Sequence, residues 1–446
     1  MRYPRLPGLV LAAIVLTATA SCTRGVERPS VVLVIIDTLR ADHLSCYGYR
    51  RDTSPVLDSL AEAGVMMENV TAQSSWTLPA TASIMSGQTP VSHGAGMDVP
   101  TGRVFGMDPE MPLLAMVMND NGYATAGFFN VYLLSGDFGF HRGFDLFECR
   151  DDGNGKADST VSSAIRWLQR VPDDRPFLLV VHLFDPHDPY DPPRPFDTLY
   201  GTGGSERDGG LEGDGGLERE IGFWKFTEEG AVADTGSRNR LEGLYDGEIA
   251  WVDGQLGRLM AQVRDLEREG TLVVVTADHG EEFLEHGYVG HGRTLYPEIT
   301  SVPLIISGTD ALRDVHPEAM CGQVDITPTI LDYCGLEMPV PVRGRSLFGL
   351  EHTGTRMLSA SGINTGSQLY QVSVRTTRKQ LIWNARTDSA ETYRLDLDPL
   401  AQEPLPADSA LLDRALFYWS TPRPWEPDML ESWEVSPVLR DLGYID

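Results

Sequence analysis

Residues 30–37 read SVVLVIID, an unbroken run of β-branched and aliphatic residues that ends in an aspartate. A strand that is apolar on both faces is typical of a parallel sheet covered by helices. Runs of the same type return at residues 176–185 (PFLLVVHLFD), 270–278 (GTLVVVTAD) and 301–307 (SVPLIIS). We therefore expect several buried strands of one central, mostly parallel sheet.

Helical patterns lie between these runs, and the clearest extends from Arg240 to Glu269. It places apolar residues on one face and stops at Gly270. Strands that alternate with helices predict an α/β fold, in which functional sites lie beyond the carboxyl ends of the strands.

Polar residues occupy two of these strand ends. Asp37 follows the first run, and Asp278 with His279 follows the run that begins at residue 270. Carboxylate oxygens and imidazole nitrogens suit a hard or borderline divalent ion. The sequence therefore indicates a metal site at this edge of the sheet.

The overall charge of the chain excludes some partners. Lys and Arg number 36 against 64 Asp and Glu, which gives the 446 residues a net charge of −28. Such a charge disfavours nucleic acid and anionic lipid as surface partners. An anionic substrate would need local positive charge from a metal or from a few placed basic side chains.

The N-terminus has the layout of an export signal. Residues 1–22 read MRYPRLPGLVLAAIVLTATASC, with two arginines, an apolar run over residues 9–16 and small residues after it. The apolar run is short for the ~20 residues of a membrane span. We expect residues 1–21 to be a signal peptide, either of the ordinary type or of the bacterial lipoprotein type that leaves a lipid on Cys22. The protein is then exported to the periplasm or cell envelope, and touches the membrane only through a lipid at Cys22.

Three segments resemble the sulfatases and their relatives in the alkaline phosphatase superfamily. They are VVLVIIDTLRADHLSCYGY (31–49), SSWTLPATASIMSG (74–87) and VVVTADHGEEFLEHGYVGHGRTLYPE (273–298). Together with weaker matches, the resemblance extends from about Ser30 to Pro399. It implies an alkaline phosphatase-like α/β sandwich with a mostly parallel central sheet and a small C-terminal antiparallel subdomain.

The expected domains follow from this resemblance and from changes in the pattern. Residues 22–352 would form the sulfatase-like catalytic domain, with a Gly-rich, acidic insertion near residues 201–218. From residue 353 to residue 446, short alternating strands and a tail predict the C-terminal subdomain.

The resemblance also assigns site residues. It implies that Asp37, Thr77, Asp278 and His279 are metal ligands and that Thr77 is the nucleophile. Thr77 precedes a short helix that ends before Gly87. A hydroxyl at the N-terminus of this helix would lie at the positive end of the helix dipole. The alternative is that Thr77 is only an N-cap residue, which is common for threonine.

Two departures from the family pattern change the expected chemistry. Formylglycine-dependent sulfatases carry C/S-x-P-x-R, whereas this chain has Thr77, Pro79 and Thr81 in that frame. No formylglycine is expected, and an unmodified, metal-activated hydroxyl remains. Many sulfatases also have a second aspartate where this chain has Thr38. With one carboxylate fewer, zinc or manganese is favoured and calcium stays possible.

Two further histidines are candidate catalytic residues. The resemblance implies that His291 binds the ester oxygens and that His187 assists departure of the leaving group. Alternatively, they could form a second metal site with Asp185. Weaker candidates are His93 and His286, together with the possible substrate contacts Asn130 and Arg293.

These features predict an exported, metal-dependent, sulfatase-like hydrolase that cleaves sulfuric esters or phosphodiester or phosphonate bonds. Its substrate would be an anionic ester of a sulfated or phosphorylated glycan, lipid or small molecule. Two alternatives remain open. One is a transferase of the phosphoglycerol or phosphoethanolamine type, and the other is a non-catalytic binding lipoprotein that retains the metal.

Overall fold

The computed structural model describes residues 28–98, 103–150, 156–201, 235–349, 358–363, 370–421 and 432–433. The expected signal peptide, Cys22 and almost all of the Gly-rich insertion lie outside these residues.

A seven-stranded sheet forms the centre of the molecule, in the order β2-β12-β9-β1-β8-β6-β7. Its strands are β1 (Val31–Ile36), β2 (Val65–Met66), β6 (Ala124–Phe129), β7 (Leu146–Cys149), β8 (Phe177–Leu183), β9 (Leu272–Ala277) and β12 (Leu304–Ser307). The five strands from β9 to β7 are parallel. The predicted α/β fold with a mostly parallel sheet is confirmed.

One predicted strand differs from the prediction in its direction. β12, from the run at residues 301–307, pairs antiparallel with β9, and β2 pairs antiparallel with β12. Between β9 and β12 lies only the four-residue helix α9 (Pro297–Thr300), besides the hairpin of β10 (Glu282–Phe283) and β11 (Val289–Gly290). A parallel strand needs a crossover connection, usually through a longer helix, and none is present here.

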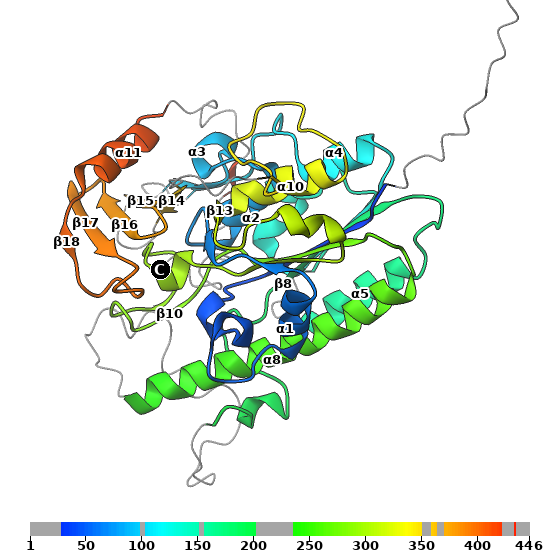
Figure 1. The fold of residues 1–446 in the computed structure, drawn as a ribbon, viewed down its shortest axis with the longest axis horizontal. Helices are drawn as coiled ribbons and strands as arrows, with labels where there is room; N and C mark the ends of the chain where they lie inside the picture. The colour runs from blue at the N-terminus through cyan, green and yellow to red at the C-terminus, as the bar shows by residue number, and fades with distance from the viewer. Residues whose placement is uncertain are drawn as a thin grey trace, which may run out of the picture.

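Helices cover both faces of the sheet (Figure 1). On one side lie α1 (Pro55–Glu62), α5 (Ala157–Leu168) and the long α8 (Thr235–Asp265), and on the other α2 (Thr77–Ser86), α4 (Leu114–Asp120) and α10 (Ile326–Tyr333). The apolar face predicted for α8 is buried at Leu241, Tyr245, Ile249, Val252, Leu256, Leu259 and Val263. Within the described residues, no helix has the length and hydropathy that crossing a membrane requires.

The C-terminal region forms a separate antiparallel sheet, as expected. It consists of β14 (Leu358–Ile363), β15 (Tyr370–Arg375), β16 (Lys379–Asn384), β17 (Ser389–Arg394) and β18 (Leu405–Pro406). Helix α11 (Ser409–Trp419) packs on it and buries Leu411 and Ala415 against Val372 and Leu381. Figure 1 shows this unit in orange and red at one side of the central sheet.

Short elements complete the described chain. β3 (Asn69–Thr71) pairs with β13 (Met320–Gly322), and β5 (Arg103–Phe105) pairs with β4 (Gly96–Asp98) and β19 (Ser432–Trp433). Helix α3 (Pro90–His93) follows α2.

The register of the sheet determines which side chains meet at its carboxyl edge. Ile36 of β1 is aligned with Ala277 of β9, so Asp37 and Asp278 leave the sheet side by side. On the other side of β1, His182 of β8 is aligned with Ile35. Because side chains alternate along a strand, His182 points to the same face as Asp37.

Candidate active site

Thr77 is the first residue of α2, and its side chain is fully buried. Its Oγ1 lies 3.4 Å from Asp37 Oδ2 and 3.4 Å from His279 Nε2. The N-cap position belongs to Trp76, which makes no side-chain cap. Reading Thr77 as only an N-cap is therefore wrong, because its hydroxyl faces the strand ends.

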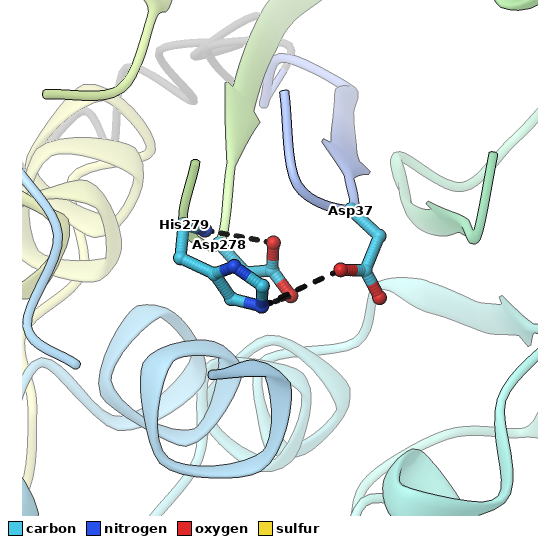
Figure 2. A group of neighbouring side chains, drawn as sticks. All are labelled: Asp37, Asp278 and His279. Atoms are coloured by element: carbon cyan, nitrogen blue, oxygen red, sulfur yellow. Dashed lines mark hydrogen bonds and ion pairs between the residues drawn. The ribbon is translucent and has the colours of Figure 1, made fainter. Parts of the chain in front are cut away.

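Asp37, Asp278 and His279 converge in front of α2 (Figure 2). His279 Nε2 lies 3.5 Å from Asp37 Oδ1 and 3.6 Å from Asp278 Oδ2. The Nδ1 of the same ring lies 2.9 Å from the carbonyl oxygen of Gly280. A proton on Nδ1 satisfies that carbonyl and leaves a lone pair on Nε2, directed at the carboxylates.

This arrangement fits a divalent cation. Asp37 Oδ1 and Asp278 Oδ2 are buried and have no hydrogen-bond partner within the described residues. Two buried carboxylates that approach the same imidazole nitrogen are costly without a compensating positive charge. Ligands held tetrahedrally at about 2.1 Å from a metal lie about 3.4 Å apart, which matches the 3.4 to 3.6 Å separations here.

The pKa shifts agree with a site prepared for a cation. Burial and the neighbouring Asp278 carboxylate raise the pKa of Asp37 well above its usual value. Burial lowers the pKa of His279 to about 4, so its ring is neutral at neutral pH. A neutral imidazole is the form that coordinates metals.

The backbone just after Asp37 is unusual. Thr38 has a φ of 52°, in the left-handed region that β-branched residues rarely adopt. The Tyr245 hydroxyl donates to the Thr38 carbonyl oxygen at 2.7 Å, and the Thr38 N–H donates to Asp278 Oδ1 at 3.2 Å. These contacts hold the bend that directs Asp37 toward Asp278.

His291 and His187 line one side of the same centre. The ring of His291 lies 4.4 Å from that of His279 and 4.8 Å from that of His187, measured between centroids. Its Nδ1 is 3.0 Å from Glu281 Oε1, and the Tyr190 hydroxyl donates to Glu281 Oε2 at 2.9 Å. Glu281 therefore fixes the orientation of the His291 ring.

His187 is held by its own loop. Its Nδ1 lies 2.7 Å from the carbonyl oxygen of Asp188, and its ring stacks on Phe184 with centroids 4.2 Å apart. Its Nε2 is buried and makes no hydrogen bond among the described residues. The structure thus brings all six predicted site residues into one region.

Within the described residues, the donors of the alternative second metal site do not form a cluster that could hold a metal. Asp185 Oδ2 accepts a hydrogen bond from the backbone N–H of Ala157, the first residue of α5, at 2.8 Å. Within the described part of the chain, neither group of potential metal ligands contains Asp185, His187 or His291.

The weaker candidates have other contacts. His93 is buried beneath α2, with Nε2 3.0 Å from Ser83 Oγ and 3.2 Å from the Pro79 carbonyl oxygen. His93 therefore supports the helix that carries Thr77. Arg293 lies over the Tyr288 ring, 5.6 Å from its centroid.

Glu282, His286 and Glu298 form a second group with metal-ligand chemistry. His286 Nδ1 lies 2.6 Å from Glu298 Oε1, and Nε2 lies 3.0 Å from the carbonyl oxygen of Ala401. Both ring nitrogens are thus engaged, which favours an imidazolium ion pair over a metal ligand. Through the Ala401 contact, His286 also joins the loop between β10 and β11 to the C-terminal region.

We expect this ion pair to make stability depend on pH. Burial opposes protonation of His286, but Glu298 outweighs it and raises the pKa above the ordinary 6.5. The stabilisation is complete below about pH 6.5 and is lost as pH rises through the raised pKa. The free energy of unfolding should fall by about 1.4 kcal/mol for each pH unit between 6.5 and the raised pKa of His286.

Denaturant unfolding at a series of pH values measures this effect. In His286→Gln the fall should largely disappear, whereas His141→Gln, at an exposed histidine, should keep it. An unchanged pH profile in His286→Gln would contradict the assignment.

Sequence reasoning missed two residues of this region. Glu281, which orients His291, stood in the quoted segment without an assigned role, and His182 lies at the centre of the site. The available signal for His182 was a lone histidine inside an apolar strand, one residue before its end. Asn130, expected only as a possible substrate contact, lies beside it, with Oδ1 3.5 Å from His182 Nδ1.

The fold and the strand-end donor set define an α/β protein whose described residues could hold a cation at the carboxyl edge of the sheet. The family model "Sulfatase" matches residues 29–336. An N-acetylglucosamine-6-O-sulfatase of Bacteroides thetaiotaomicron is 24% identical over 424 residues, which cover 76% of this chain and 75% of the relative. The multifunctional alkaline phosphatase superfamily protein PehA of Trinickia caryophylli is 25% identical over 401 residues, covering 72% and 76%.

Solved structures share the fold. The protein BT4656, in complex with its substrate D-glucosamine-2-N,6-O-disulfate, superposes with a TM-score of 0.71 at 18% identity, over 90% of this chain and 100% of that one. The phosphonate monoester hydrolase of Agrobacterium radiobacter gives a TM-score of 0.68 at 20% identity, over 88% and 94%.

The chain belongs to the sulfatase family. Sulfatase superfamily members are metal-dependent, and this chain retains residues able to hold a metal. Family and fold support a sulfatase-like hydrolase of sulfate or phosphonate esters, with an anionic ester as its substrate.

Proposed function

We propose that this protein is a metal-dependent ester hydrolase in which the unmodified Thr77 hydroxyl is the nucleophile. The observation that carries the proposal is the position of Thr77 Oγ1, 3.4 Å from both Asp37 and His279 at the start of α2. A hydroxyl at a helix N-terminus is favourably placed both to ionise and to meet an anionic ester.

Asp37, Asp278, His279 and Thr77 would hold the cation. When bound, it would favour ionisation of Thr77 and neutralise the ester oxygens. The two carboxylates and neutral imidazole suit zinc or manganese, while calcium prefers more oxygen ligands. No formylglycine is expected, because Thr77 stands in the place of the Cys or Ser that is oxidised.

The other residues would complete a two-step reaction. Thr77 Oγ1 attacks the sulfur or phosphorus, and water later cleaves the Thr77 ester. Burial raises the pKa of Glu281 to about 8, so its carboxyl can donate to His291 Nδ1 and leave an Nε2–H that would hold a non-bridging oxygen of the ester. His187 has its Nδ1 proton on the Asp188 carbonyl, so as an imidazolium it can deliver the Nε2 proton to the leaving oxygen.

The substrate class is an anionic ester of a sulfated or phosphorylated glycan, lipid or small molecule. Support comes from one structural neighbour that binds a sulfated glucosamine and from another that is a phosphonate monoester hydrolase. The signal-like residues 1–22 support export to the periplasm or cell envelope, with a lipid on Cys22 as the anchor.

Matched nitrophenyl esters test this function. The purified chain would be given the sulfate, phosphate monoester, phosphate diester and phosphonate, each with zinc, manganese or calcium. We expect turnover of at least one ester with zinc or manganese. Absence of turnover with every ester and every metal would reject the hydrolase and favour the metal-retaining binding protein.

A further inference from the structure

We propose that His182 is an additional ligand of the cation, bound through Nε2. The inference rests on the cation site of the proposed function and extends its ligand set to strand β8. Within the described chain, the other protein donors come from β1, the start of α2 and the end of β9.

The contacts of His182 place it in the same cluster. Its Nε2 lies 3.6 Å from Asp37 Oδ2 and 3.9 Å from Asp278 Oδ2, and its side chain is fully buried. Each oxygen of Asp37 thus faces a different imidazole, because Oδ1 lies 3.5 Å from His279 Nε2. The two carboxylates lie between two rings rather than beside one.

The hydrogen-bonding of the His182 ring also indicates that Nε2 is a metal ligand. His182 Nδ1 lies 3.5 Å from Asn130 Oδ1, an acceptor, which favours the tautomer with the proton on Nδ1. Nε2 then carries a lone pair toward two carboxylates, and it makes no hydrogen bond within the described chain. Lone pairs that face carboxylate oxygens repel one another unless a cation lies between them.

His279 shows the same arrangement, with Nδ1 on the Gly280 carbonyl oxygen and Nε2 toward the carboxylates. Histidines that bind metals usually donate their second N–H to a carbonyl or carboxylate, which fixes the ring. The ring of His182 is further held by Phe129, stacked at 6.2 Å between centroids.

A doubly protonated His182 would be the alternative, as a buried counter-ion of the carboxylates. Charge-assisted N–H···O bonds are about 2.7 to 2.9 Å long, and the separations of 3.6 and 3.9 Å exceed this. They lie closer to the spacing of ligands around one metal, which is about 3.4 Å for tetrahedral zinc. The geometry therefore favours a ligand.

This ligand explains how the site compensates for Thr38. The second carboxylate expected in many sulfatases is absent there, and an imidazole enters from the neighbouring strand instead. Two carboxylates, two imidazoles and the Thr77 hydroxyl form a mixed nitrogen and oxygen donor set that suits zinc or a similar borderline ion better than calcium.

Metal binding tests the inference independently of catalysis. The full chain would be stripped with a chelator, then titrated with Zn²⁺ in a calorimeter and with Co²⁺ followed by its visible absorption. In His182→Phe, which keeps a ring of similar volume, we expect Zn²⁺ affinity to fall at least about 100-fold. The Co²⁺ spectrum should also change, because one nitrogen donor is lost.

His141→Phe is the control, since it makes the same substitution at an exposed histidine that contacts none of the proposed ligands. Its affinity should stay within about threefold of wild type. If His182→Phe does not fold, Asn130→Ala provides a second variant that removes the carbonyl oxygen facing His182. Loss of this orienting contact should weaken Zn²⁺ binding by about 10-fold.

Unchanged Zn²⁺ affinity and an unchanged Co²⁺ spectrum in folded His182→Phe would overturn the inference, and so would a wild-type chain that binds neither ion. Nitrophenyl ester hydrolysis, measured on the same samples, separates this inference from the proposed function. A chain that binds Zn²⁺ through His182 but hydrolyses nothing would reject the hydrolase and retain the ligand. If the protein hydrolyses the esters but His182→Phe leaves its metal affinity unchanged, the proposed hydrolase is retained and His182 is rejected as a ligand.

Discussion

Thr77→Ala is expected to lower kcat for the best nitrophenyl ester by about 10⁴-fold or more, because it removes the attacking oxygen. The fold should persist, since alanine is a good residue for the first turn of α2. Steady-state kinetics on metal-saturated protein measures the loss, and circular dichroism checks the fold.

Thr77→Ser is the matched control. It keeps a hydroxyl at the start of α2 and should retain activity within about 100-fold of wild type, because only the methyl group that restrains the side chain is lost. A trapped covalent ester on Thr77, found by mass spectrometry after rapid quenching, would identify the nucleophile directly. Substantial hydrolysis by Thr77→Ala would show instead that water attacks and that Thr77 is at most a ligand.

Removal of the metal is expected to abolish hydrolysis and to destabilise the fold. Without a cation, the buried carboxylates of Asp37 and Asp278 face each other without compensation. Burial and Asp278 raise the pKa of Asp37, so metal-free protein should lose stability as pH rises from the ordinary range of an aspartate toward that raised value. At neutral pH, the metal-free form should unfold several degrees below the loaded form.

Asp37→Asn separates the effect of the metal on stability from its effect on hydrolysis. The metal-free variant should be more stable than metal-free wild type at neutral pH, because one buried charge is gone. It should gain little from added Zn²⁺ and should hydrolyse the esters at background rate. Thermal unfolding with and without chelator is the measurement. Equal melting temperatures of loaded and stripped wild type would argue against a cation between these carboxylates.

Much of the fold was predictable from local patterns. The buried strands β1, β8 and β9 each have a continuous apolar sequence, and period-two alternation predicted the C-terminal sheet. Asp37 and Asp278 could be placed in one site because parallel strands present their carboxyl ends at the same edge.

Other features depend on which strands are neighbours, and the sequence does not contain that information locally. A buried apolar strand has the same pattern in either direction, so the antiparallel course of β12 was not predictable. His182 was missed because its meaning depends on the alignment of β8 beside β1. The hydroxyl direction of Thr77 likewise depends on how α2 sits against the strand ends.

The bend at Thr38 has a consequence for how this site can diverge. Its left-handed backbone is a conformation that aspartate and asparagine adopt far more readily than threonine. The main chain at this position is thus already shaped for the acidic residue that many sulfatases carry there. A Thr38→Asp substitution would add a third carboxylate next to Asp37 without rebuilding of the loop, and would shift the donor set toward the oxygen ligands that calcium prefers. The same backbone can therefore accept donor sets of different oxygen content.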